Sequence, residues 1–143
     1  MSISIVTGSG GLIGAEAVKF FSGKFNKIIG IDNNSRQYFF GKTASVISNI
    51  NKLKKEIKNY EHQYIDIRNK EKIEKIFKRY RKNIKFILHC AAQPSHDWAA
   101  REPFTDFSIN ALGTLNILES MRRYSPNAKM IHMSTNKVYG DRP

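Results

Sequence analysis

The sequence predicts one α/β domain with three layers, built on a doubly wound parallel sheet of about five strands in the order 3-2-1-4-5. Short apolar runs alternate with amphipathic segments along the whole chain. The runs are apolar on both faces, which is typical of strands in a parallel sheet covered by helices. A glycine-rich turn joins the first run to the first amphipathic segment, where such a sheet makes its first crossover.

The expected strands are the apolar runs at residues 3–6, 27–32, 63–67, 84–89 and 129–133. Helices are expected from Leu12 to near Gly23, over 43–57, and over 73–80 with Asn69 as the capping residue. Pro103 is expected to open a long helix. Seven of its side chains are expected to face inward: Phe104, Phe107, Ala111, Leu112, Leu115, Leu118 and Met121. Segments 33–42 and 93–102 are expected to be irregular loops.

Length and composition fit a single globular domain covering residues 1–143. Hydrophobic residues make up 41% and charged residues 25% of the chain, which argues against disorder. Cys90 is the one cysteine, so an intrachain disulfide is excluded and a cysteine-based zinc site is not expected. Residues 2–15 are uncharged but rich in glycine, which does not fit a signal peptide or a membrane span. We expect a cytoplasmic protein with no metal and no membrane partner.

The net charge of +12 is unusually high and could mark a nucleic-acid partner. Residues 51–85 hold 13 basic and 5 acidic residues, and most of the lysines alternate with apolar residues at helical spacing. A solvated helix face explains such a distribution. We therefore expect no nucleic-acid partner, with binding through the basic helices as the competing interpretation.

The strongest motif is the glycine-rich turn at residues 7–14. Gly8, Gly11 and Gly14 form a G-x-x-G-x-x-G pattern between the first strand and the first helix. Glycine at the turn permits a backbone conformation closed to other residues. Glycine at the helix start lets a pyrophosphate approach the N–H groups at the positive end of the helix dipole. This pattern predicts dinucleotide binding on a Rossmann-type sheet.

Asp32 ends the second expected strand, 18 positions beyond Gly14. A carboxylate there can accept hydrogen bonds from the ribose hydroxyls of a dinucleotide and would repel the 2′-phosphate of NADP. The sequence therefore favours NAD, although Arg36 is close enough to meet a phosphate. Asp66 can either bond an adenine amino group or cap the following helix. The small residues Ala91 and Ala92 either leave room for a cofactor or simply pack.

Six motifs in order resemble the extended short-chain dehydrogenase/reductases that act on nucleotide sugars. They are TGSGGLIG at 7–14, GID at 30–32, YIDIR at 64–68, HCAAQPS at 89–95, NALGTLN at 110–116 and STNKVYG at 134–140. Segments 31–41, 93–107 and 134–143 more narrowly resemble the CDP-paratose 2-epimerases, also called CDP-tyvelose epimerases. The resemblance implies NAD as cofactor, a nucleotide sugar (here a CDP-sugar) as substrate, and leaves a homo-oligomer open.

The resemblance also implies site residues. Those for the cofactor are Gly8, Gly10, Gly11, Leu12, Ile13, Gly14, Asp32, Asn33, Ser35, Arg36, Asp66, Ile67, Ala91, Ala92, Gln93 and Asn110. Those for the substrate are Pro94, Ser95, His96, Trp98 and Arg101. Thr135 is implied as the catalytic hydroxyl, four residues before Tyr139, with Ser134 as the alternative.

The implied reaction removes a hydride from a sugar carbon to NAD and returns it to the opposite face, with a family Tyr-x-x-x-Lys pair supplying the base. That pair does not occur at the family position within these 143 residues. We therefore expect the chain to be the NAD-binding, amino-terminal half of such an epimerase and not to turn over substrate by itself. A non-catalytic dinucleotide-binding module is the alternative.

Overall fold

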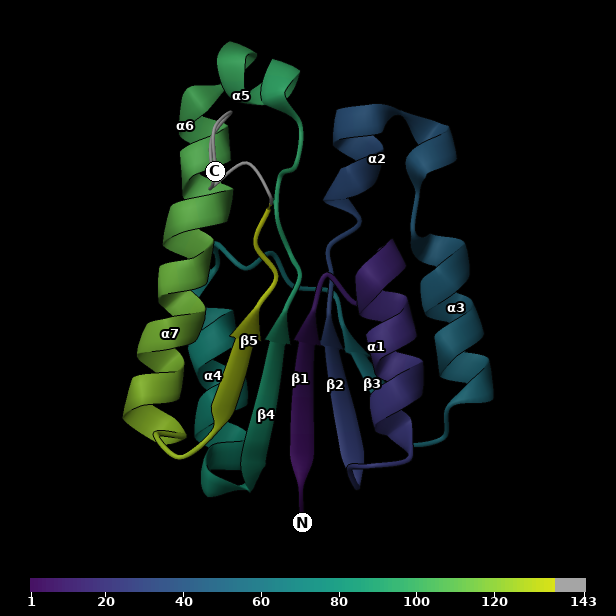
Figure 1. The fold of residues 1–143 in the computed structure, drawn as a ribbon, viewed down its shortest axis with the longest axis vertical. Helices are drawn as coiled ribbons and strands as arrows, with labels where there is room; N and C mark the ends of the chain where they lie inside the picture. Colours follow the sequence, from purple (N-terminus) through teal and green to yellow (C-terminus); the bar gives the residue numbers. More distant parts are fainter. Residues whose placement is uncertain (136–143) are drawn as a thin grey trace.

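The fold is a five-stranded parallel sheet with helices on both faces. The structure, a computed structural model, describes residues 1–135, so the expected Val138-Tyr139-Gly140 segment lies outside the described residues. The strands run in the order β3-β2-β1-β4-β5, with β1 in the middle of the sheet (Figure 1). Their bounds are β1 Ile3–Thr7, β2 Lys27–Ile31, β3 Tyr60–Gln63, β4 Ile84–His89 and β5 Lys129–His132. The predicted class and strand order are confirmed.

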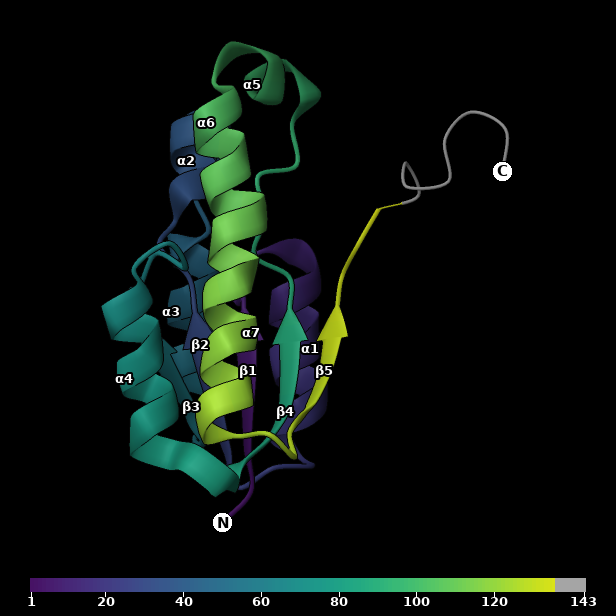
Figure 2. The same ribbon diagram turned by 90° about the vertical axis from the view of Figure 1, so that its left-hand side faces the viewer.

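Alternate residues of β1 face two separate hydrophobic layers. Ile3 and Ile5 are buried with residues of β2, α4 (Lys70–Tyr80) and α7 (Gly113–Tyr124). Val6 points to the opposite layer, which includes residues of α1 (Leu12–Ser22) and α3 (Ile47–Glu56). Figures 1 and 2 show these two pairs of helices on opposite faces of the sheet. Burial of both faces explains why the strands carry no polar alternation.

The remaining elements connect these layers. They are α2 (Ser35–Phe40), η1 (Lys42–Ala44), η2 (Arg81–Asn83), α5 (His96–Arg101), α6 (Pro103–Phe107) and η3 (Ser108–Leu112), the last a turn of π-helix. The expected cap of α4 is confirmed, because the Asn69 side chain accepts a hydrogen bond from the Lys72 N–H at 3.0 Å. Segments 33–42 and 93–102, expected to be irregular, contain α2, η1 and α5 instead. Phe39 of α2 and Trp98 of α5 pack together with ring centroids 5.3 Å apart, and this tertiary contact supports helices too short to read from periodicity.

The third strand was expected at residues 63–67, and that expectation is wrong. The strand is Tyr60–Gln63, and the Ile65 N–H turns back to the Gln63 carbonyl oxygen at 2.9 Å. Ile65 and Ile67 are nevertheless buried in the core on the α4 and α7 side. Two buried residues at alternate positions of a connecting segment reproduce the strand pattern without strand pairing.

Gly30 of β2 lies where two side chains cross above the sheet. The Ser9 Oγ and the Tyr60 hydroxyl oxygen are 3.0 Å apart in a hydrogen bond. A Cβ atom on Gly30 would lie 2.4 Å from the Tyr60 hydroxyl oxygen and 2.6 Å from Ser9 Oγ. The glycine at this position therefore permits a polar contact between β3 and the glycine-rich turn.

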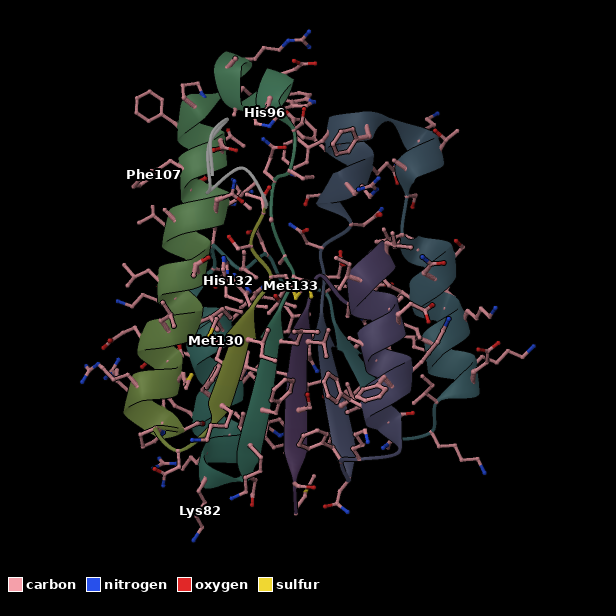
Figure 3. The ribbon with its side chains drawn as sticks, viewed as in Figure 1. Lys82, His96, Phe107, Met130, His132 and Met133 are labelled. Atoms are coloured by element: carbon pink, nitrogen blue, oxygen red, sulfur yellow. The ribbon has the colours of Figure 1, made fainter. Side chains whose placement is uncertain are left out.

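The expected inward face of the long helix is wrong. The side chain of Phe104 is 89% exposed, that of Leu115 56% and that of Leu118 45%, and Figure 3 shows Phe107 on the outer side of α6. The buried residues are instead Ile109, Gly113, Ile117 and Ser120, with Met121 packed against the core as expected. Ala111, Leu112 and Phe107 are exposed with the others.

A close approach at Gly113 explains this rotation of the helix. A Cβ atom there would lie 2.6 Å from Cδ1 of Ile67, so the smallest residue faces the core. The π-turn of η3 also adds one residue to the helical repeat, which shifts the phase between α6 and α7. The most apolar stripe consequently points outward: Phe104, Phe107, Leu112, Leu115 and Leu118.

Candidate functional site

The glycine-rich turn runs from the carboxyl end of β1 into α1, at the middle of the sheet. Gly8 has a φ of +65°, a conformation that favours glycine. A Cβ atom on Gly14 would lie 2.1 Å from the Gly8 carbonyl oxygen. The Gly11 N–H also donates to that oxygen at 3.0 Å. The turn is therefore fixed by contacts that only glycine at positions 8 and 14 permits.

The N-terminus of α1 opens from this turn without a side-chain cap. Gly11 is the residue before the helix, and no side chain bonds its first turn. The first N–H groups of an α-helix have no acceptor within the helix. A Cβ atom on Gly11 would meet only the Gly8 carbonyl oxygen, at 3.3 Å, so there is open space in front of the helix end. These N–H groups and the helix dipole together favour an anion such as a phosphate.

Asp32 is held beside this helix end by two backbone groups. Its Oδ2 accepts a hydrogen bond from the Gly10 N–H at 3.0 Å, and its Oδ1 accepts one from the Asn34 N–H at 2.8 Å. Each carboxylate oxygen has a second lone pair that can accept from a ligand. The carboxylate is thus oriented in advance and keeps accepting capacity for two hydroxyl groups.

A cavity of about 340 Å³ lies over the carboxyl ends of the central strands. In a doubly wound sheet this is the place where strand order reverses and ligands bind. The expected cofactor residues that line it are Gly8, Gly11, Leu12, Ile13, Gly14, Asp32, Asn33, Ser35, Arg36, Asp66, Ile67, Ala91 and Ala92. Pro94, expected at the substrate, also lines it. These expected residues therefore reach one cavity from four separate segments of the chain.

Three expected cofactor residues do not line the cavity but support its walls. A Cβ atom on Gly10 would lie 2.7 Å from Cγ2 of Val46, and the Asn49 amide donates to the Gly10 carbonyl oxygen at 3.0 Å. The side chain of Asn110 bonds the backbone of Gln93 at both its N–H (2.9 Å) and its carbonyl oxygen (3.0 Å). These residues position the segments that do line the cavity.

Asp66 is part of a charged cluster at one wall. It accepts hydrogen bonds from the Arg68 guanidinium, at 2.6 Å for the shortest, and from the Asn33 amide at 3.0 Å. Burial by itself raises the pKa of Asp66, but the bonds from Arg68 and Asn33 outweigh it and leave the pKa below its usual value. The cap of α4 is Asn69, so the interpretation of Asp66 as that cap is wrong.

The remaining residues expected at the substrate belong to α5 and the residue that precedes it. The side chain of Ser95 caps α5, and the Trp98 indole N–H donates to the Phe39 carbonyl oxygen at 2.7 Å. Figure 3 shows His96 at the far end of the molecule from the strands. Ser95, His96, Trp98 and Arg101 do not line the cavity.

The cavity also has lining residues that sequence reasoning missed. They are Ile31, Phe39, Phe40, Val46, Ile65, Cys90, Ile109 and Met133. Most are apolar, and the sequence pattern of apolar residues does not distinguish a cavity wall from a hydrophobic core. Cys90 is the exception, because it lies inside the HCAAQ segment that already pointed to the cofactor. Ser134, the alternative catalytic hydroxyl, also lines the cavity, next to Met133 at the end of β5 (Figure 3), and exposed Thr135 follows it.

The described part of the chain offers no cluster of three or more His, Cys, Asp or Glu side chains that could hold a metal ion. Within residues 1–135 there is also no helix with the length and apolar character needed to cross a membrane.

Comparison with known proteins finds similarity along nearly the whole chain. The model of a family described as GDP-mannose 4,6 dehydratase matches residues 5–143. CDP-paratose 2-epimerase from Salmonella typhi is 36% identical over 137 residues, covering 96% of this chain and 38% of that protein. A putative UDP-glucose 4-epimerase from Methanocaldococcus jannaschii is also 36% identical, covering 96% of this chain and 39% of that protein.

Solved structures of similar fold cover the same region. UDP-glucose 4-epimerase from Thermotoga maritima, solved with UDP-glucose, gives a TM-score of 0.74 at 30% identity over 93% of this chain and 38% of that one. dTDP-glucose 4,6-dehydratase from Bacillus anthracis, solved in complex with NAD, gives a TM-score of 0.74 at 25% identity over 98% and 39%. The chain therefore spans less than half the length of the relatives it matches.

Proposed function

Because this chain belongs to the GDP-mannose 4,6-dehydratase family of nucleotide-sugar epimerases and dehydratases, we propose that it binds NAD in the cavity over β1 and β4. The observation that carries the proposal is the uncapped N-terminus of α1, open beside Gly11 and flanked by the oriented carboxylate of Asp32. The residues present fit a dinucleotide: the helix end fits a pyrophosphate and Asp32 fits a ribose diol.

The charges at the cavity support NAD over NADP. Both oxygens of Asp32 are held by backbone N–H groups, Oδ2 by Gly10 of the turn and Oδ1 by Asn34, so the carboxylate cannot easily rotate away from a 2′-phosphate. Arg36 lines the same cavity, but its guanidinium lies 5.0 Å from the ring centroid of Phe40 in a cation–π contact. Asp66 is proposed to accept from the adenine amino group, in place of capping a helix.

We propose further that the family activity of this protein is the 2-epimerisation of a CDP-sugar. NAD supplies the hydride acceptor and donor for the sugar carbon when it is bound. Thr135 is proposed to hydrogen-bond the reacting sugar hydroxyl, with Ser134 as the alternative. Pro94, Ser95, His96, Trp98 and Arg101 are the proposed substrate residues. The resemblance of segments 31–41 and 93–107 to the CDP-paratose 2-epimerases supports a CDP-sugar, whereas the identity of 36% is shared with a putative UDP-glucose 4-epimerase and supports a nucleotide sugar in general.

Calorimetric titration of the purified protein with NAD and with NADP tests the cofactor proposal. We expect NAD to bind more tightly, and failure of both dinucleotides to bind would refute it. Because the family Tyr-x-x-x-Lys pair does not occur at its position within these 143 residues, no turnover by this chain is expected, and the substrate class is tested by binding. The measurement is calorimetric titration of the NAD-bound protein with CDP-paratose, UDP-glucose and dTDP-glucose. Binding of UDP-glucose without binding of the CDP-sugar would contradict the proposed class.

The outward apolar stripe of α6, η3 and α7 supports a homo-oligomer. Its side chains are Phe104, Phe107, Leu112, Leu115 and Leu118, and a stripe of that kind is a common interface between protein chains. We propose that a second copy covers it, with sedimentation analysis as the test.

A further inference from the structure

A buried histidine connects two parts of the cavity wall that are far apart in sequence. His89, the last residue of β4, is 1% exposed. Its Nδ1 lies 2.6 Å from Thr7 Oγ1 at the end of β1, and its Nε2 lies 3.0 Å from Thr114 Oγ1 at the start of α7. None of these three side chains has a role in the proposed binding of NAD or of the nucleotide sugar.

The direction of each hydrogen bond follows from counting donors and acceptors. Thr7 Oγ1 accepts from the backbone N–H groups of Cys90 and Ala91, both at 3.1 Å, and these fill its two lone pairs. The Cys90 N–H is shared with the Thr7 carbonyl oxygen at 3.2 Å. The hydroxyl hydrogen of Thr7 must therefore donate to Nδ1 of His89.

The directions of the remaining hydrogen bonds follow from the acceptor state of Nδ1 of His89. Because Nδ1 accepts, the proton of the neutral imidazole is on Nε2, which donates to Thr114 Oγ1. The Thr114 hydroxyl in turn donates to the Asn110 carbonyl oxygen at 2.6 Å, within the π-turn of η3. His89 is thus a donor on one side and an acceptor on the other, in a single tautomer.

The two ends of this series of hydrogen bonds hold the segment that follows β4, residues 90–93. Thr7 Oγ1 holds the N–H groups of Cys90 and Ala91, and the Asn110 side chain holds the N–H and carbonyl oxygen of Gln93. Cys90, Ala91 and Ala92 line the cavity. One wall of the cavity is therefore fixed at its two ends, and His89 joins the two fixed points.

We propose that His89 is a positioning residue for cofactor binding, which acts through Thr7 and Thr114 to hold residues 90–93 against the dinucleotide. The proposal rests on NAD being the ligand of this cavity. This role requires a neutral imidazole with its proton on Nε2. A doubly protonated ring would also carry a proton on Nδ1, and it would present that N–H to Thr7 Oγ1, whose lone pairs are already filled. Burial, together with His132 at 5.3 Å between ring centroids, lowers the pKa of His89 to about 4 and keeps the ring neutral.

Nitrogen-15 NMR of the ligand-free protein tests the hydrogen-bond chain without reference to NAD. We expect His89 to show the Nε2–H tautomer at pH 7 and no titration between pH 6 and 8. The amides of Cys90 and Ala91 are expected to exchange slowly with solvent. The Nδ1–H tautomer, or titration of His89 near the ordinary pKa of about 6.5, would overturn the proposal.

Variants at Thr114 test the consequence for binding. Thr114→Val removes the hydroxyl with little change of shape, whereas Thr114→Ser keeps it and serves as the matched control. We expect Thr114→Val to weaken NAD binding by about three- to tenfold, the effect of one lost hydrogen bond, and Thr114→Ser to stay within about twofold of the native affinity. Urea unfolding of both variants shows whether each is folded.

Three results have distinct meanings. Equal NAD affinity of folded Thr114→Val and the native protein overturns the positioning role. Equal weakening by Thr114→Val and Thr114→Ser overturns it too, because the hydroxyl would then not be the cause. Absence of NAD binding by the native protein refutes the proposed function, and the tautomer and amide exchange in the ligand-free protein then decide whether His89 fixes this segment.

Discussion

The Gly10 N–H donates a hydrogen bond to Oδ2 of Asp32 at 3.0 Å. The glycine-rich turn after β1 and the acidic residue after β2 are therefore joined before any ligand arrives. In sequence the two features are separate signals for a phosphate and for a ribose. In the structure they form one preorganised unit, and such preorganisation lowers the cost of ordering groups when a ligand binds.

Replacing Asp32 by alanine is expected to weaken NAD binding by about 1–3 kcal/mol, because hydrogen bonds to a charged group are lost. The preference for NAD over NADP is expected to fall with it, since the carboxylate no longer repels a 2′-phosphate. Calorimetry with both dinucleotides measures this, with Glu119→Gln on α7 as the control. Equal affinities for NAD and NADP in the native protein would rule out the role given to Asp32.

Two glycines of the turn are expected to respond differently to substitution. Gly11→Val adds a side chain into the open space before α1, so we expect NAD binding to be lost while the urea midpoint changes little. Gly14→Ala forces a Cβ atom to within 2.1 Å of the Gly8 carbonyl oxygen. We expect that change to lower the free energy of unfolding by about 1–3 kcal/mol. The assignment fails if Gly11→Val binds NAD normally.

The free energy of unfolding is expected to fall as pH decreases from about 6.5 toward 4. The pKa of His89 is about 4 in the folded protein and about 6.5 when unfolded. Between these values the unfolded chain binds a proton that the folded protein does not, so stability rises with pH by up to about 1.4 kcal/mol per unit. Urea unfolding of the native protein and of His89→Gln at several pH values measures it.

His62 affects the same pH range and serves as the internal comparison. Burial lowers its pKa too, so some slope is expected to remain in His89→Gln. The difference between native and variant slopes isolates His89. Identical slopes would show that His89 is not buried in its neutral form.

A charge on the apolar stripe is expected to prevent self-association. In Leu115→Lys with Leu118→Lys the changed side chains are already about half exposed, so the fold is expected to remain intact. Sedimentation velocity at several concentrations compares the double variant with the native protein. A monomeric native protein would exclude this stripe as an interface between copies.

The parts of this fold that could be predicted from the sequence are those that local chemistry determines. The strand order follows from alternating apolar runs, and the carboxyl-end position of Asp32 follows from its place after β2. The face of α7 could not be predicted, because Gly113 packs against Ile67 through the absence of a side chain. A glycine adds nothing to the hydrophobic periodicity of a helix, so the periodicity does not reveal such a contact. It also misses a π-turn, which shifts the phase of the pattern.

The candidate site likewise contains residues that local chemistry identifies and residues that only tertiary packing brings to the cavity. Glycines and acids have position-specific chemistry, so Gly8, Gly14 and Asp32 could be identified in advance. Phe39 and Met133 reach the cavity only through the packing of α2 and the end of β5. The role of Thr7 likewise depends on a partner 82 positions away along the chain, and no local pattern contains that information.

The crossing of Ser9 and Tyr60 above Gly30 restricts the order in which this sequence can change over evolutionary time. Any larger residue at position 30 would collide with the Tyr60 hydroxyl. Substitution of Tyr60 by a shorter residue must come first, and it leaves Ser9 without this partner. A Cβ atom at position 30 would also lie 2.6 Å from Ser9 Oγ, so loss of Tyr60 frees this position only where the Ser9 side chain moves or is replaced as well. Positions 30 and 60 are therefore expected to change together during evolution, with Tyr60 replaced before Gly30.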